Sequence, residues 1–360
     1  MRFSPRFAAT LLVATALASC ASPPPAPIPV AVVPPAAPPP PPVAMPAAFI
    51  EHASAYRAYM QKAAQVSPAF KDGAEVEQSL TSAVAYEPKQ FLRGVIAYAA
   101  LVALQSPQFV AGVRTYAVDP VQRREMAQRL IADPNYATVL PSAASAAGLV
   151  QAALSADAAK VQRAGALVKQ AAYDVQHQAW SKKDIPGREA RLANAKLLSA
   201  QPLSPPAEDV QRLQGAVNGR DSTGASALGV SGEALAPPYT AVVARGLTLA
   251  ALAALGEAND ANMAAMEPLL QESTSAFCIN LSKLNVYQCL AVAGPYYEDV
   301  FCLGQHVLLD TAQCVAKAAG EARPISIADA APPPPAPQPL QSVSAGSGAA
   351  APGSAAGLRR

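Results

Sequence analysis

Residues 277–320 read FCINLSKLNVYQCLAVAGPYYEDVFCLGQHVLLDTAQCVAKAAG, and this stretch contains four of the five cysteines of the 360-residue chain. Gly294-Pro295 interrupts helix near its middle, because proline lacks the amide hydrogen that an interior helical position needs. Proline suits the first turn of a new helix, and Glu298 and Asp299 follow it where the helix dipole favours anions. The stretch therefore predicts two antiparallel helices joined at Gly294-Pro295.

The four cysteines lie almost symmetrically about that turn. Reflection about it pairs Cys289 with Cys302 and Cys278 with Cys314. This nested pattern resembles the arrangement in twin-CxnC helical hairpins, although the spacings within each helix differ from those of that family. The resemblance covers only the hairpin and implies no function.

Helix geometry suits one arm of this hairpin better than the other. Cys278 and Cys289 are 11 residues apart, a step that returns almost to the same face of an α-helix. Cys302 and Cys314 are 12 residues apart. The extra residue places Cys314 about 100° further round the helix than an 11-residue step would. We therefore expect a bend or break after Gly304.

Two other arrangements of these cysteines remain open from the sequence. Sequential pairs, Cys278 with Cys289 and Cys302 with Cys314, would close two short loops. A zinc site could use Cys302 and His306 with the other thiolates. With Cys20 set aside for the export signal at the start of the chain, an even number of cysteines remains, and in an exported protein this favours disulfides, so we expect two disulfides and no metal.

The rest of the chain has the composition of an alanine-rich helical protein. Hydrophobic residues make up 51% of the chain but aromatic residues only 6%. Helical periodicity dominates residues 49–201 and 239–322, including expected helices over 157–180 and 262–276, and strand-like alternation is scarce. Residues 202–238 are rich in Pro, Gly and Ser, and long connections of this kind are either functional or mobile. The sequence predicts an all-α bundle of two helical subdomains.

The first 19 residues have the parts of an export signal: a cationic start, a short apolar run and small residues at the end. The run ends in Leu17-Ala18-Ser19-Cys20, which resembles the lipobox of bacterial lipoproteins. The resemblance implies cleavage before Cys20 and a diacylglycerol on its thiol, with an acyl chain such as palmitate on the new amine. Ala21 resembles the sorting default for the periplasmic face of the outer membrane. The alternative is an ordinary secretory signal with a chance cysteine.

Two biased segments flank the predicted helical body. Residues 20–48 are proline-rich and predict an extended tether between the lipid and the body. Residues 323–360 combine Pro, Ala, Gly and Ser with almost no large apolar side chain, so they predict a disordered tail.

No motif for catalysis or cofactor binding stands out. His52, His177 and His306 are scattered, and the charge of +2 provides no basic stripe for nucleic acid. Tyr296 to Asp299 could line a site, but a capped helix start explains them more simply.

We therefore expect a non-catalytic envelope lipoprotein without a cofactor, which presents a helical binding module to an envelope protein or to peptidoglycan. The alternatives are an envelope enzyme, such as a cell-wall hydrolase with a site across the Gly/Ser-rich connection, and a small-molecule carrier with an apolar cavity.

Overall fold

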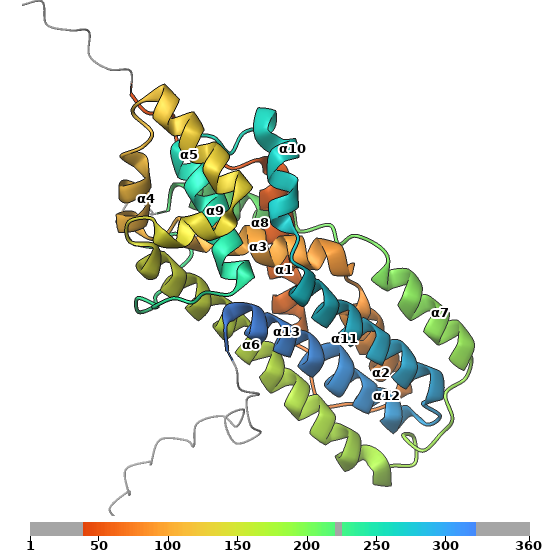
Figure 1. The fold of residues 1–360 in the computed structure, drawn as a ribbon. Helices are drawn as coiled ribbons and strands as arrows, with labels where there is room; N and C mark the ends of the chain where they lie inside the picture. The colour runs from red at the N-terminus through yellow and green to blue at the C-terminus, as the bar shows by residue number, and fades with distance from the viewer. Residues whose placement is uncertain (1–38, 220–224, 322–360) are drawn as a thin grey trace, which may run out of the picture. The chain divides into compact units, whose positions relative to one another are not determined.

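The computed structural model describes residues 39–219 and 225–321. The predicted signal peptide, Cys20, most of the predicted tether and the predicted tail lie outside these ranges. Helices account for all the regular elements in the described ranges, and one isolated bridge joins Asp184 to Pro295, so the all-α prediction is confirmed (Figure 1).

The α-helices are α1 (Ala47–Ala64), α2 (Gly73–Val84), α3 (Pro88–Ala103), α4 (Pro107–Arg114), α5 (Pro120–Ala132), α6 (Ala143–Asp174), α7 (Arg188–Ser199), α8 (Ala207–Gly215), α9 (Ala241–Leu255), α10 (Met263–Met266), α11 (Ser273–Val292), α12 (Tyr296–Cys302) and α13 (Asp310–Ala319). Shorter 3-10 segments include η1 (Pro134–Val139) and η5 (Glu267–Leu270), and η6 (Leu303–Leu309) is a π-helix.

The helical body begins before the predicted end of the tether at residue 48. Helix α1 starts at Ala47, because Phe49 and Ile50 in its first turn are both buried. Met45 is buried as well, and the amide of Ala44 donates to the carbonyl of Ala253 in α9. The last residues of the predicted tether therefore belong to the folded body.

Helix α3 is deeply buried, with no exposed residue from 94 to 103. It packs against α1 and against α9. Small residues let the backbones approach closely: a Cβ added to Gly246 of α9 would lie 2.7 Å from the Cβ of Ala99. Among the described residues no single helix is long and apolar enough to cross a membrane, and α3 and α4 meet that criterion only together, bent by 86°.

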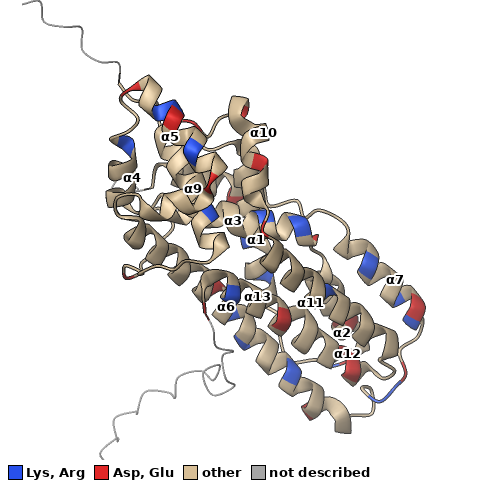
Figure 2. Ribbon diagram, in the orientation of Figure 1, with Lys and Arg blue, Asp and Glu red and all other residues tan. Residues whose placement is uncertain are grey.

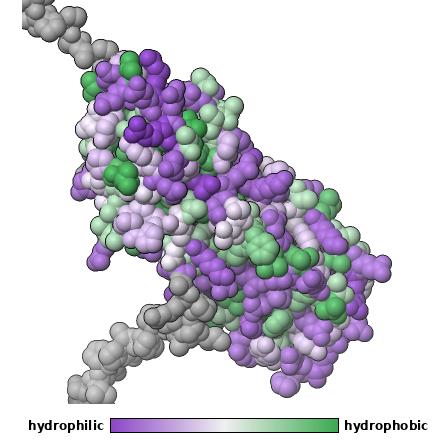
Figure 3. Space-filling view, viewed as in Figure 1, coloured by the Kyte–Doolittle hydropathy of each residue, from purple (hydrophilic) through white to green (hydrophobic). Residues whose placement is uncertain are grey.

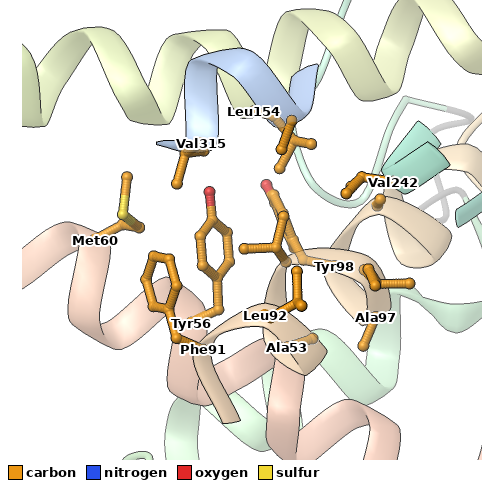
Figure 4. Packing of buried hydrophobic residues seen from close by; sticks show 14 of the residues in the cluster. Ala53, Tyr56, Met60, Phe91, Leu92, Ala97, Tyr98, Leu154, Val242 and Val315 are labelled. Atoms are coloured by element: carbon orange, nitrogen blue, oxygen red, sulfur yellow. The ribbon is translucent and has the colours of Figure 1, made fainter. Parts of the chain in front are cut away.

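One hydrophobic core includes side chains from both sides of the 202–238 connection. In Figure 4, the rings of Tyr56 (α1) and Tyr98 (α3) lie near Leu154 (α6), Val242 (α9) and Val315 (α13). The centroids of the two tyrosine rings are 5.6 Å apart. The two predicted helical segments therefore share a core.

The C-terminal hairpin contains both disulfides in the nested pairing. Cys278 is bonded to Cys314, and Cys289 to Cys302. The first bond links α11 to α13, and the second links α11 to the end of α12. The structure therefore does not have the sequential pairing. Because Cys302 is in a disulfide, it has no thiolate to bind zinc as the alternative site would require.

The expected break after Gly304 is instead a π-helix. Helix η6 lies between Cys302 and Cys314, and each turn of a π-helix takes about one residue more than an α turn. The extra residue of the 12-residue step is absorbed in this way, so Cys314 faces α11. Gly304 also lies against α6, where an added Cβ would come within 2.4 Å of the Lys169 backbone nitrogen.

Within the Gly/Ser-rich connection, residues 232–235 pack on α6. The amide of Leu235 donates to the carbonyl of Ala144 at 2.9 Å. A Cβ on Gly148 would lie 1.7 Å from the carbonyl oxygen of Glu233, so only glycine permits this approach. The backbone of this short segment is therefore in direct contact with the backbone of α6.

The prediction of one helix over 262–276 was wrong. Helix α10 ends at Met266, a 3-10 turn with Pro268 follows, and α11 begins only at Ser273. The Glu272 carboxylate accepts hydrogen bonds from two amides of the first turn of α11, at 2.7 and 2.6 Å. This N-cap and the proline together divide the segment.

Candidate functional site

A cavity of about 320 Å³ lies between α2, α7 and α12. Its walls include Arg191 from α7, Asp299 and Tyr296 from α12, and Glu77 from α2. The sequence placed Tyr296 and Asp299 in a capped helix start, and the structure places both on this wall. Nothing in the sequence indicated Arg191, which is 108 residues from Asp299.

A buried ion pair forms the floor of this site. The Arg191 Nη1 atom donates to Asp299 Oδ2 at 2.6 Å, and Nη2 donates to the Leu290 carbonyl oxygen. The two side chains are only 6% and 3% exposed. One guanidinium therefore links α7, α11 and α12.

The protonation of Asp299 is shifted toward neutrality. Burial raises its pKa to about 6; Arg191 opposes the shift, and the carboxylates of Glu298 and Glu77 add to it. Glu77 is exposed, whereas Asp299 is buried and committed to its ion pair. Two carboxylates and a guanidinium around one cavity are groups that acid–base chemistry uses.

Lys283 lies buried between α11, α2 and α7. Its ammonium donates to the carbonyl of Val84, the last residue of α2, and to Ser199 Oγ at 3.1 Å. It also lies 3.4 Å from the centre of the Tyr86 ring. Burial lowers the pKa of Lys283 well below its ordinary value. These contacts fix α11 against two neighbouring helices, so the lysine is structural.

The outward face of α11 carries three exposed apolar side chains among polar ones such as Asn280 and Gln288. Phe277, Leu281 and Leu284 are 69%, 42% and 49% exposed, and their spacing puts them on one side of the helix. Apolar residues are visible on the surface along α11 in Figure 3. We call these three residues the α11 surface. The sequence pattern missed it, because apolar residues on a helix predict burial.

The remaining predicted features do not form a site. Cys20 lies outside the described residues. His306 pairs through Nδ1 with Asp310 at 2.9 Å, and the described ranges contain no group of three or more metal-binding side chains. Lysine and arginine are interspersed with aspartate and glutamate along the described helices, without a basic stripe (Figure 2).

Comparison with known proteins adds no relative from which a role could be inferred. No family model, no curated protein and no solved structure matches the chain.

Proposed function

We propose that the chain is a non-catalytic lipoprotein of the bacterial cell envelope. A lipid on Cys20 holds it at the periplasmic face of the outer membrane, and its helical body binds another envelope protein. The tetrad Leu17-Ala18-Ser19-Cys20 supports the anchor. The α11 surface supports the binding role, and it is the observation that carries the proposal.

The arrangement of the α11 surface favours a protein partner. Single exposed apolar residues are common, but three at positions i, i+4 and i+7 of one helix match the anchors with which a helix enters an apolar groove. The two disulfides of α11 hold the helix in place before binding, which reduces the entropy lost on association. Peptidoglycan presents sugars and polar peptides, which offer little apolar surface to these side chains.

Photo-crosslinking in intact cells tests this role. A photoreactive amino acid at position 277 or 281 should link the chain to one envelope protein, and the double variant Leu281→Ser/Leu284→Ser should abolish the link formed from position 277. The melting temperature should stay the same, since both leucines are exposed. Val139 in η1, which is 74% exposed, is the matched control position. Equal products from positions 139 and 277, or none from 277, would contradict the proposal.

A second candidate is a cell-wall hydrolase, which the cavity with Glu77 and Asp299 favours. If the chain is a hydrolase, the purified protein should digest peptidoglycan in a gel assay. Glu77→Gln should then abolish digestion, while Glu75→Gln on the same helix should not. Absence of digestion by the folded wild-type chain would eliminate this candidate.

A further inference from the structure

A second cavity, of about 580 Å³, lies between α3, α9, η5 and α11. Three cationic side chains line it: Lys89 and Arg93 from α3 and Arg245 from α9. The predictions from sequence used none of them. The carboxylate of Glu272 lines the cavity as well, so the walls carry three cations and one anion.

Arg245 is the unusual member of this group. It is the only charged residue of α9, a helix in which nearly every other side chain is buried. Its own side chain is partly buried, its Nε atom is buried without a hydrogen-bond partner, and no ion pair of Arg245 occurs within the described ranges. Because the described ranges supply no acceptor for this partly buried guanidinium, an anion in the cavity would be its charged partner there.

Two carboxylates lie close to these cations, and each already has partners. Arg93 Nη2 pairs with Glu267 at 2.6 Å, which orients the guanidinium and leaves its other donors free. Burial alone would raise the pKa of Glu272, but hydrogen bonds from Ser275 and Thr274 hold it below its ordinary value. Glu272 is thus the ionised cap of α11, and the described ranges show no ion pair between it and Arg245.

The other walls of the cavity are partly apolar. Leu92, Leu270 and Ala276 line it together with two prolines. A volume near 580 Å³ falls within the range of about 300–1,000 Å³ for small-molecule sites, which combine apolar walls with a few placed polar groups.

We propose that this cavity binds a small organic anion, with a carboxylate or phosphate on a compact apolar body. Arg245 is its main contact, Arg93 a second donor, and the exposed Lys89 adds positive potential at the rim. This site is separate from the α11 surface and does not rest on the proposed function.

Titration calorimetry with the full-length chain in a non-ionic detergent tests the site. The probes are benzoate and phenyl phosphate, with benzyl alcohol as the uncharged control. We expect at least one anion to bind and the alcohol not to bind. Arg245→Met should weaken binding by about ten-fold or more, since it removes the charge-assisted hydrogen bonds while keeping a long apolar chain.

The controls separate loss of the site from loss of the fold. Lys71→Met removes an exposed cation outside the cavity and should leave binding unchanged. Without ligand, Arg245→Met should melt at the wild-type temperature or above, because it removes a partly buried unpaired charge. Benzyl alcohol binding as tightly as the anions, unchanged anion affinity in Arg245→Met, or no binding of either anion at about 10 mM would overturn the proposal.

Discussion

At the residue scale, the buried pair of Arg191 and Asp299 shows how one position can shift the pH response of the whole fold. The pKa of Asp299, about 6, lies above the ordinary aspartate value of 3.8. Between these two values the folded chain holds a proton on Asp299 and the unfolded chain does not. Stability from this group is therefore fully present below the lower value and is lost as the pH rises through about 6.

We accordingly expect titration of Asp299 to lower the free energy of unfolding of the wild type by up to about 3 kcal/mol between pH 4 and pH 6. The Asp299→Asn variant should lack this decrease. Urea unfolding at pH 4, 5, 6 and 7 measures the difference in slope. The slope is informative even though the asparagine variant loses its ion pair with Arg191. Parallel profiles for the two proteins would show that Asp299 does not titrate in this window.

Two glycine-to-alanine variants, one of them a control, test the close approach of η6 to α6. Gly304→Ala should destabilise the fold by about 1–3 kcal/mol, because the added methyl meets the backbone of Lys169, which cannot move aside like a flexible side chain. Gly215→Ala at the end of α8 is the matched control, since nothing lies within 4 Å of the added Cβ. Thermal unfolding of both variants gives the comparison, and equal melting temperatures would contradict the packing described for Gly304.

At the element scale, the C-terminal hairpin was the best-predicted part of the chain. The symmetry of the cysteines about Gly294-Pro295 is a local signal, and the nested pairing follows from it. The π-helix was not foreseen, although the 12-residue step required a departure from α geometry before Cys314. A sequence pattern can indicate that a helix must be irregular, whereas packing against Lys169 and its neighbours decides the form of the irregularity.

The two disulfides should contribute unequally to stability. The bond from Cys278 to Cys314 spans 36 residues, and the bond from Cys289 to Cys302 spans 13. Loop entropy predicts losses of about 4 and 3 kcal/mol when each pair is replaced by alanine. Guanidinium unfolding of the two double variants provides the measurement. A larger loss from the inner pair would mean that contacts around the bonds, not chain entropy, set their contributions.

At the scale of the whole molecule, the sequence predicted the class of the fold but not which side chains from distant helices line the same cavity. Periodicity identifies helices because it is local, and it misplaced the segment 262–276 where Pro268 and the cap at Glu272 act. The cavities could not be foreseen. Nothing in the sequence indicates that Arg245 lines the same cavity as Arg93, since no local rule relates α9 to α3.

The proposed lipid anchor on Cys20 leads to a prediction about the processing and location of the whole chain. Cys20→Ala should abolish labelling with an alkyne fatty acid and leave unprocessed or mislocalised precursor, because only the thiol can carry the thioether lipid. Wild type and variant are compared by metabolic labelling and membrane fractionation. Full labelling of the variant would refute the lipoprotein assignment.

The contact region around Tyr56 has a consequence for how the chain is made. Val315, from the last described helix, lies in the same core as Tyr56 from the first. A nascent chain that has not yet released α13 therefore lacks one wall of that core, however many residues have already been synthesised. Folding of this body is therefore expected to finish only once α13 is available, so a product truncated before α13 would keep its early helices exposed to proteases.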